Sequence, residues 1–189
     1  MITCEKMKSL RLAVCCVCLV AATAYPQSRF NSPAPAGFSG QVPSARDPDQ
    51  RFLREMIDHH EGLIYLVHEA MQRPISKKAH DVLDGFDVTE DAEKREMSEV
   101  LRSLSGNSYQ GAPTKRDKRS ADSVLRQSGS PTFDRLASIF VVSHHRRGIQ
   151  LVDAFLPRIR RPRVRELAVT IRRKERREMA FHQRRLATD

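Results

Sequence analysis

The chain has 189 residues, a formal net charge of +10, and 40% hydrophobic and 30% charged residues. This length allows one domain, or two small repeats that share a core. All four cysteines lie near the N-terminus, at Cys4, Cys15, Cys16 and Cys18. The remaining chain therefore forms no disulfide or thiolate metal site and has no cysteine nucleophile, so its stability depends on an apolar core.

The N-terminal segment has the pattern of a secretory signal peptide. Lys6, Lys8 and Arg11 precede an apolar run that ends in the small-residue cleavage pattern A-T-A at residues 22–24. The apolar run is too short to span a bilayer. We therefore predict cleavage near Ala24, no transmembrane segment in the mature chain, and secretion to an extracellular or periplasmic compartment.

Residues 25–48 are rich in Pro, Ser, Gly and Ala and show no periodicity, which predicts a disordered leader. From Asp49 the apolar residues recur at spacings of three and four, which is typical of an amphipathic helix. Pro74 ends this helix, because proline disrupts the interior of a helix. A second helical segment follows, so residues 49–104 are predicted to form a first helical hairpin.

Residues 105–131 are polar and low in apolar content, and we interpret them as a basic linker. Within this linker, the stretch from Arg116 to Arg119 resembles the R-x-K-R site of furin-type processing proteases. Proteolytic cleavage concentrates in exposed linkers, which makes this stretch a candidate processing site in a eukaryotic source.

Two stretches of the chain resemble each other: MIDHHEGLIYLV, from Met56, and VVSHHRRGIQLV, from Val141. Each contains adjacent histidines in an apolar run and is followed by a second helical pattern, so residues 132–187 are predicted to form a second helical hairpin. One amphipathic hairpin cannot bury its apolar stripe alone, whereas two hairpins can bury each other's. The sequence therefore predicts an all-α four-helix bundle over residues 49–187.

The second helices of the two hairpins align along one predicted face. In the first hairpin this face comprises Val82, Phe86, Thr89, Glu93, Glu96, Val100 and Leu104, and in the second Val164, Ala168, Ile171, Glu175, Glu178, His182 and Leu186. Glutamate is rarely buried unless it is paired. The glutamates would line the bundle interior together with the adjacent histidines of the first helices, His59, His60, His144 and His145.

Three interpretations fit this pattern. The histidines and glutamates could form buried structural pairs that fix the register of the helices. They could instead bind a transition metal, because imidazole suits copper, zinc, nickel and iron, and carboxylates supplement it or orient the rings. The glutamates could also simply be exposed.

The sequence favours binding over catalysis. A di-iron carboxylate centre in a bundle needs Glu-x-x-His, where this chain has Glu-x-x-Glu. The chain has no nucleophile elbow and no P-loop. We therefore expect no catalytic residue of a known hydrolase or phosphate-binding type.

The same residues resemble a known family. The pattern Asp49-x-x-Phe52-Leu53-x-x-Met56-Ile57-x-His59-His60, followed by Glu93-x-x-Glu96-Met97, resembles the secreted ferritin-like proteins of domain-of-unknown-function family 305 (DUF305). That family often carries two such hairpins, and some members look like periplasmic copper- or silver-binding proteins. The resemblance implies a ferritin-like four-helix bundle that handles metal.

Carried over to this chain, the resemblance implies metal ligands at His59, His60, Glu96, His144, His145 and Glu178, with further candidates at Met56, Glu93, Glu175 and His182. Val141, Val100 and His182 stand where the pattern has methionine. Fewer thioethers and additional His and Glu shift the expected metal from Cu(I) or Ag(I) towards Cu(II) or Zn(II). The implied cofactor is thus copper or zinc.

The last helical segment suggests an alternative function. It is strongly basic, with a nearly continuous run of Arg172, Arg173, Lys174, Arg176 and Arg177. Such a face would suit a non-metal interaction module that binds a polyanion, such as a sulfated glycan or an anionic membrane surface. The segment has one aromatic residue, Phe181, so a specific nucleic-acid partner is not favoured.

Overall fold

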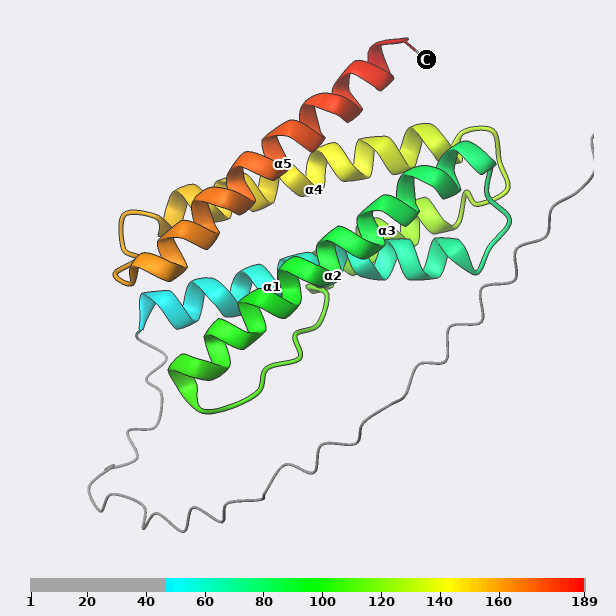
Figure 1. Cartoon of the computed structure of the whole chain (residues 1–189). Helices are drawn as coiled ribbons and strands as arrows, with labels where there is room; N and C mark the ends of the chain where they lie inside the picture. The colour runs from blue at the N-terminus through cyan, green and yellow to red at the C-terminus, as the bar shows by residue number, and fades with distance from the viewer. Residues whose placement is uncertain (1–46, 189) are drawn as a thin grey trace, which may run out of the picture. The chain divides into compact units, whose positions relative to one another are not determined.

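The computed structural model describes residues 47–188, which form five α-helices and no β-strand. Four helices are long, namely α1 (Pro48–Met71), α2 (Lys77–Ser105), α4 (Phe133–Phe155) and α5 (Pro162–Thr188), and α3 (Lys115–Leu125) is short (Figure 1). The predicted signal peptide, the leader up to residue 46 and all four cysteines lie outside the described residues. Within 47–188 no helix is long and apolar enough to cross a membrane.

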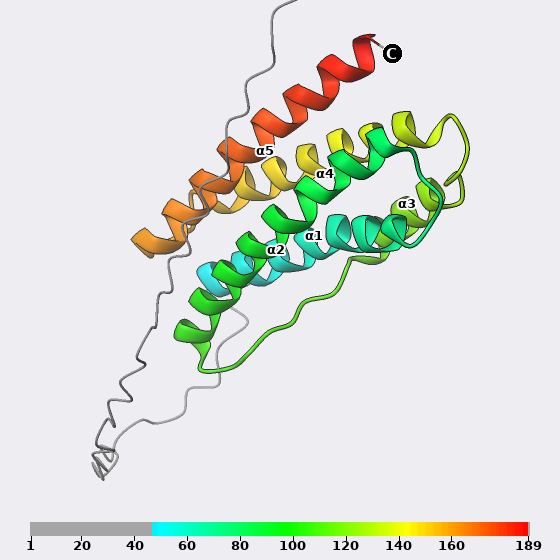
Figure 2. The ribbon, with the colours of Figure 1, turned by 45° about the vertical axis from the view of Figure 1, so that its right-hand side comes forward.

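The long helices form two hairpins. α1 packs against α2, and α4 packs against α5, while contacts between α1 and α4 join the hairpins into one bundle. Figures 1 and 2 show the same pairing from two directions, with α5 diverging from α4 towards its C-terminal end. The all-α bundle of two helical hairpins predicted from the sequence is therefore confirmed.

Local sequence signals set the helix ends. The side chain of Asp47 caps α1 by accepting a hydrogen bond from the backbone N–H of Asp49 at 2.9 Å. Ser76 caps α2 in the same way, through the N–H of Ala79 at 2.9 Å. Gly106 ends α2 with a φ of 71°, a left-handed conformation that glycine adopts without steric cost. These signals fix the length of the first hairpin.

The buried carboxylate of Asp49 ties the two hairpins together at one end. It accepts hydrogen bonds from the backbone N–H groups of Arg160 (2.8 Å) and Arg161 (3.0 Å), in the turn between α4 and α5. The guanidinium of Arg161 also contacts this carboxylate at 2.9 Å. The start of α1 is therefore held against the α4–α5 turn.

The bundle interior contains a polar layer between two apolar clusters. One cluster includes Leu63, Leu66, Val67, Leu83, Phe86, Ala121, Leu125, Phe133, Phe140 and Val141. The other includes Phe52, Leu53, Met56, Ile57, Met97, Leu101, Val152, Phe155, Val164, Ala168 and Ile171. Along α1 and α4 the paired histidines lie between the residues of these clusters and are buried. Apolar side chains therefore shield the polar layer from both sides.

The segment predicted as a linker, residues 105–131, contains the helix α3. This helix packs on α1 and α4 and buries three apolar side chains, Ala121, Val124 and Leu125. Thr114 caps it by accepting a hydrogen bond from the N–H of Asp117 at 3.1 Å and donating one to the Asp117 carboxylate at 2.7 Å. The prediction of an exposed linker is thus wrong for residues 115–125, and the furin-like stretch lies within a helix.

Candidate metal centre

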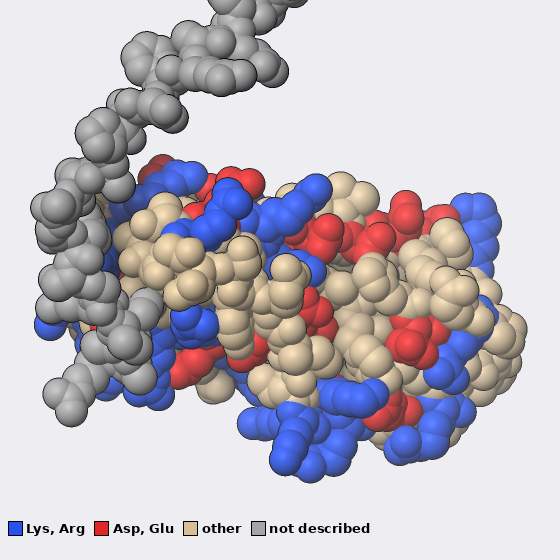
Figure 3. All heavy atoms as spheres, turned by 90° about the horizontal axis from the view of Figure 1, so that it is seen from below, with Lys and Arg blue, Asp and Glu red and all other residues tan. Residues whose placement is uncertain are grey.

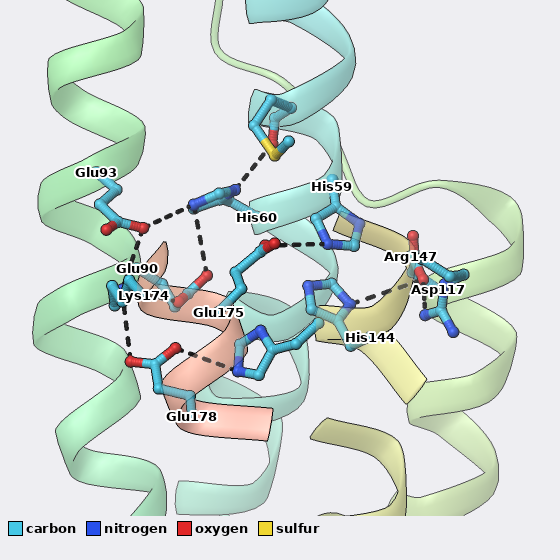
Figure 4. Close-up of polar contacts among 12 residues, drawn as sticks. His59, His60, Glu90, Glu93, Asp117, His144, Arg147, Lys174, Glu175 and Glu178 are labelled. Carbon is cyan, nitrogen blue, oxygen red and sulfur yellow. Dashed lines mark hydrogen bonds and ion pairs between the residues drawn. The ribbon is translucent and has the colours of Figure 1, made fainter. Parts of the chain in front are cut away.

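All five helices contribute side chains to the polar layer (Figure 4). These are His59 and His60 from α1, Glu90 and Glu93 from α2, Asp117 from α3, His144 and His145 from α4, and Lys174, Glu175, Glu178 and His182 from α5. Each of the five histidines is at most 5% exposed. The two histidine pairs found in the sequence therefore lie together in the interior of one bundle.

On α2 the buried face is shifted by one residue from the predicted face. Its buried residues include Leu83, Phe86, Glu90, Met97 and Leu101. Glu96 lies outside the layer, because its side chain is 43% exposed and forms an ion pair with Arg163 of α5. The expectation that Glu96 faces the histidines is therefore wrong, and Glu90 takes its place. Met97 marks the correct face, since Glu90 lies two helical turns before it.

Two glycines make room for the carboxylates of this layer. A Cβ atom at Gly148 would lie 2.2 Å from Oε1 of Glu175, so only glycine allows this carboxylate to approach α4. A Cβ atom at Gly62 would lie 2.7 Å from the Cβ of Asp117, so glycine also lets α3 approach α1. The close approach of Glu175 to α4 and of Asp117 to α1 thus depends on these two glycines.

His60 is held as an imidazolium. Its Nδ1 lies 3.0 Å from the carbonyl oxygen of Met56, and its Nε2 lies 3.1 Å from Glu93 and 3.7 Å from Glu90. Since these oxygens all accept hydrogen bonds, both ring nitrogens must donate. Burial opposes this charge, but the carboxylates of Glu90 and Glu93 outweigh it and raise the pKa of His60 to about 9. A doubly protonated ring has no lone pair for a metal. The side chain of Met56 packs in the apolar cluster.

His59 and His144 form a stacked pair between α1 and α4. Their ring centroids are 3.8 Å apart, with the ring planes inclined by 8°. Burial lowers the pKa of His59 well below its usual value, and the neighbouring rings of His144 and His60 lower it further. Burial also lowers the pKa of His144. Both rings are therefore neutral at pH 7 and keep a free lone pair.

The contacts of this stacked pair are longer than hydrogen bonds. Nε2 of His59 lies 3.7 Å from Oε1 of Glu175, and Nδ1 of His144 lies 3.8 Å from Oδ1 of Asp117. Burial raises the pKa of Glu175 well above its usual value. Burial would also raise the pKa of Asp117. Contacts with His144, Thr114 and Arg147 outweigh burial, so the pKa of Asp117 is lowered. Asp117 is therefore the ionised carboxylate next to this pair.

A second group of donors lies beside the first. Nε2 of His145 is 3.3 Å from Oε2 of Glu178, in a geometry that is not a hydrogen bond. Burial lowers the pKa of His145 well below its usual value and that of His182 to about 4. Burial also raises the pKa of Glu178 to about 7. A groove of about 440 Å³ between α2 and α5 borders Glu178 and His182.

Unpartnered polar atoms are concentrated in this layer. Among residues 47–188, eight buried side-chain nitrogen or oxygen atoms lack a hydrogen-bond partner, and all eight belong to His59, His144, His145, Glu175, Glu178 and His182. Each such atom costs about 1–3 kcal/mol when it is left unpaired in a protein interior. A structural network of paired His and Glu would satisfy these atoms, so their number favours a ligand in this layer.

A surface cavity gives access to the stacked pair. It measures about 290 Å³ and is lined by Glu55, Asp58, His59, Thr114, Arg116, Asp117, Arg147 and Leu151. The residues that connect it to the polar layer are His59 and Asp117. Its lining combines acidic and basic side chains, three carboxylates and two guanidinium groups.

Comparison with known proteins identifies the family. The sequence profile of a domain of unknown function, DUF305, matches residues 49–186, which include every residue of the polar layer. The chain belongs to the DUF305 family. The resemblance stated from the histidine motif is therefore confirmed, and the match also spans α3. The comparison with curated protein sequences gives no match.

Two solved structures share the DUF305 fold. One is CopM in the Cu(II)-bound form, with 18% sequence identity and a TM-score of 0.61, covering 74% of this chain and 96% of that chain. The other is a DUF305 fragment from Deinococcus radiodurans, with 19% identity and a TM-score of 0.63, covering 78% of this chain and all of that chain. At this level of identity the likeness shows a common fold.

The basic helix α5 of this DUF305 protein does not present a continuous run of free cations. Lys174 points into the polar layer, and Arg172 pairs with Asp153 at 2.8 Å. The exposed members of the predicted run are Arg173, Arg176 and Arg177. Elsewhere on the molecule, on the face seen from below in Figure 3, basic and acidic side chains are interspersed. The predicted polyanion-binding surface thus loses Lys174.

Proposed function

We propose that the protein binds a transition metal ion, copper or zinc, in its buried polar layer, with His59, His144 and Asp117 as the primary ligands. One donor atom from each of these residues lies within 4.8 Å of the others. Two neutral imidazoles and one carboxylate are a donor set that suits Cu(II) and Zn(II). The observation that carries this proposal is the set of unpartnered ring nitrogens on His59 and His144.

His145, Glu178 and His182 are proposed as further donors in the same layer. Their unpartnered atoms are two neutral imidazole rings and one carboxylate, which is again a copper or zinc donor set. They could complete the coordination of one ion or hold a second. Glu175 lies 3.7 Å from Nε2 of His59, the unpartnered nitrogen of that ring, and is proposed as a further oxygen donor on this side.

The remaining candidates from the sequence have other roles in this proposal. His60 donates through both ring nitrogens, to Met56 and to Glu93, so it has no lone pair for a metal ion. Glu93 accepts the hydrogen bond from this ring. Glu96 is exposed and paired with Arg163. The resulting function is metal binding or buffering in the secreted protein, without a catalytic step.

Copper is the first metal to test. One protein with a similar fold is CopM in the Cu(II)-bound form. This supports the choice of metal, while the choice of ligands is supported by the histidines of this chain.

The experiment compares two double variants. The variant His59→Ala/His144→Ala removes the stacked pair, whereas the control His68→Ala/His80→Ala removes two histidines on exposed positions of α1 and α2. Purified residues 47–189 are titrated with Cu(II) and Zn(II) by calorimetry, and nitrogen coordination of Cu(II) is followed by electron paramagnetic resonance. We expect wild type and control to bind with nitrogen ligation and the first variant to lose it. Equal binding by all three proteins would exclude the proposed site.

A further inference from the structure

A second cluster in the polar layer is built around a lysine. The Nζ atom of Lys174 lies 3.1 Å from Oε2 of Glu93, 3.2 Å from Oε1 of Glu90 and 3.8 Å from Oε1 of Glu178 (Figure 4). Its side chain is 15% exposed, and that of Glu90 is 3% exposed. Three carboxylates from α2 and α5 thus converge on one ammonium group.

Two of the three carboxylates in this cluster are matched by two cations. The carboxylates of Glu90 and Glu93 face two cations, the ammonium of Lys174 and the imidazolium of His60. Burial alone would lower the pKa of Lys174, but the carboxylates of Glu90, Glu178 and Glu93 outweigh burial and raise the pKa. Nζ of Lys174 is therefore a largely buried cation with carboxylate partners from three residues.

Without the lysine, the same carboxylates would form a metal site. Donor atoms of His60, Glu90 and Glu93 lie within 4.8 Å of one another, and Glu178 adds a further oxygen. Carboxylate oxygens suit hard divalent ions such as Mn²⁺. The position between them is already filled by Nζ of Lys174.

We propose that Lys174 is a resident counter-ion that fills this carboxylate site and keeps divalent metal ions out of it. A metal ion that enters the layer then meets neutral imidazoles on one side and, on the other, carboxylates that Lys174 already occupies. Lys174 would thus leave imidazole nitrogens, and not these carboxylate oxygens, available as ligands for a metal ion. This inference stands on the geometry around Lys174 and does not depend on metal binding at His59 and His144.

The test replaces the lysine and uses Mn²⁺ as the probe, because Mn²⁺ prefers carboxylate oxygen to imidazole. The variant Lys174→Met keeps the length of the side chain without its charge. Lys94→Met is the matched control, because Lys94 also bridges two carboxylates, Glu61 at 2.9 Å and Asp91 at 3.2 Å, but outside the histidine layer. Lys174→Arg retains the positive charge.

We expect Lys174→Met to bind one Mn²⁺ ion per chain with about 100-fold higher affinity than wild type, the size expected when a like charge next to a cation site is removed. Wild type, Lys94→Met and Lys174→Arg should show no such gain. Binding is measured by the loss of the free Mn²⁺ signal in electron paramagnetic resonance. Adding Glu90→Gln and Glu93→Gln to Lys174→Met should abolish the gain.

The folding of the variant gives a second readout. Lys174→Met leaves carboxylates without their counter-ion, so its melting temperature should fall and should recover when Mn²⁺ is added, while that of wild type should not respond. The proposal is overturned if Lys174→Met neither binds Mn²⁺ better than wild type nor is stabilised by it. It is also overturned if wild type binds Mn²⁺ tightly and loses this binding in Glu90→Gln/Glu93→Gln.

Discussion

The imidazole rings of His59 and His144 lie face to face, with centroids 3.8 Å apart. Two protonated rings at this distance would repel each other strongly in a buried layer that excludes water. The stacked arrangement therefore excludes a pair of protonated rings, and burial lowers the pKa of each ring so that both are neutral. Neutral imidazole is also the form that binds metal, so the packing of the pair and its proposed chemistry require the same protonation state.

Metal should stabilise the folded protein at neutral pH. At a free metal concentration 100 times the Kd, the free energy of unfolding should rise by about 2.7 kcal/mol. Because protons compete with metal for the histidines, this gain at pH 7.5 should fade towards about pH 5. Differential scanning calorimetry with Cu(II), Zn(II) or a chelator measures it. Melting temperatures that are indifferent to all three at pH 7.5 would rule out the metal site.

The metal-free protein should lose stability at alkaline pH because of His60. Its pKa in the folded state is about 9, above the usual 6.5, so the folded chain holds a proton that the unfolded chain releases between these values. The stabilisation is full below pH 6.5 and is lost as the pH rises through about 9. This loss should be on the order of 2–3 kcal/mol.

Urea unfolding of wild type and His60→Gln between pH 7.5 and 9.5 tests this prediction. The pKa of Glu178 is about 7 and that of Glu175 is raised, but both groups are present in both proteins. Wild type should therefore lose more stability across the window than the variant. Parallel curves for the two proteins would show that His60 is not protonated in the folded state.

Substitution by alanine should destabilise the protein at Gly148 and stabilise it at Gly85. At Gly148 a Cβ atom would overlap the Glu175 carboxylate at 2.2 Å, so Gly148→Ala should destabilise the protein by about 1–3 kcal/mol. At Gly85 no atom lies within 4 Å of the added Cβ, so Gly85→Ala should stabilise α2 by about 0.5–1 kcal/mol. Chemical denaturation measures both, and a stabilising Gly148→Ala would mean that Glu175 does not approach α4.

Asp117→Asn should release α3 from the bundle. The Asp117 carboxylate pairs with Arg147 of α4 and accepts a hydrogen bond from Thr114, and the variant weakens both contacts at a cost of about 2 kcal/mol. Hydrogen exchange of residues 115–125 should accelerate, and Cu(II) affinity should fall. The control is Ser123→Ala, an exposed change on the same helix. Unchanged exchange in Asp117→Asn would show that this carboxylate does not hold α3 in place.

The sequence predicted the bundle and its histidines because both rest on strong signals. His59 and His60 lie in a run of apolar residues, and the same pattern returns at His144. The periodicity of the apolar residues defines the buried face of the helix. A histidine between apolar residues on that face is therefore buried with them. The family motif points to the same residues.

The carboxylates and the lysine were harder to assign, for reasons of geometry. A buried face can shift by one residue along α2 without breaking the three-and-four spacing, and this exchanged Glu96 for Glu90. Lys174 stands among arginines, and only its position four residues before Glu178 indicates that it shares a face with that carboxylate. Asp117 lies in a polar segment, where the pattern Thr114-x-x-Asp117 was the one signal of a helix start.

His60 and His145 hold equivalent places in the two repeats, yet the first is an imidazolium and the second is neutral. The difference arises because Glu90 and Glu93 surround one ring, whereas His145 faces a single, weakly acidic carboxylate. The two hairpins therefore contribute different groups to the layer and do not form two copies of one site. In the first hairpin His60 carries an additional proton, whereas in the second hairpin His145 is neutral and keeps a free lone pair. Two copies of the first hairpin, or two copies of the second, would therefore not reproduce the polar layer that the two different hairpins form together.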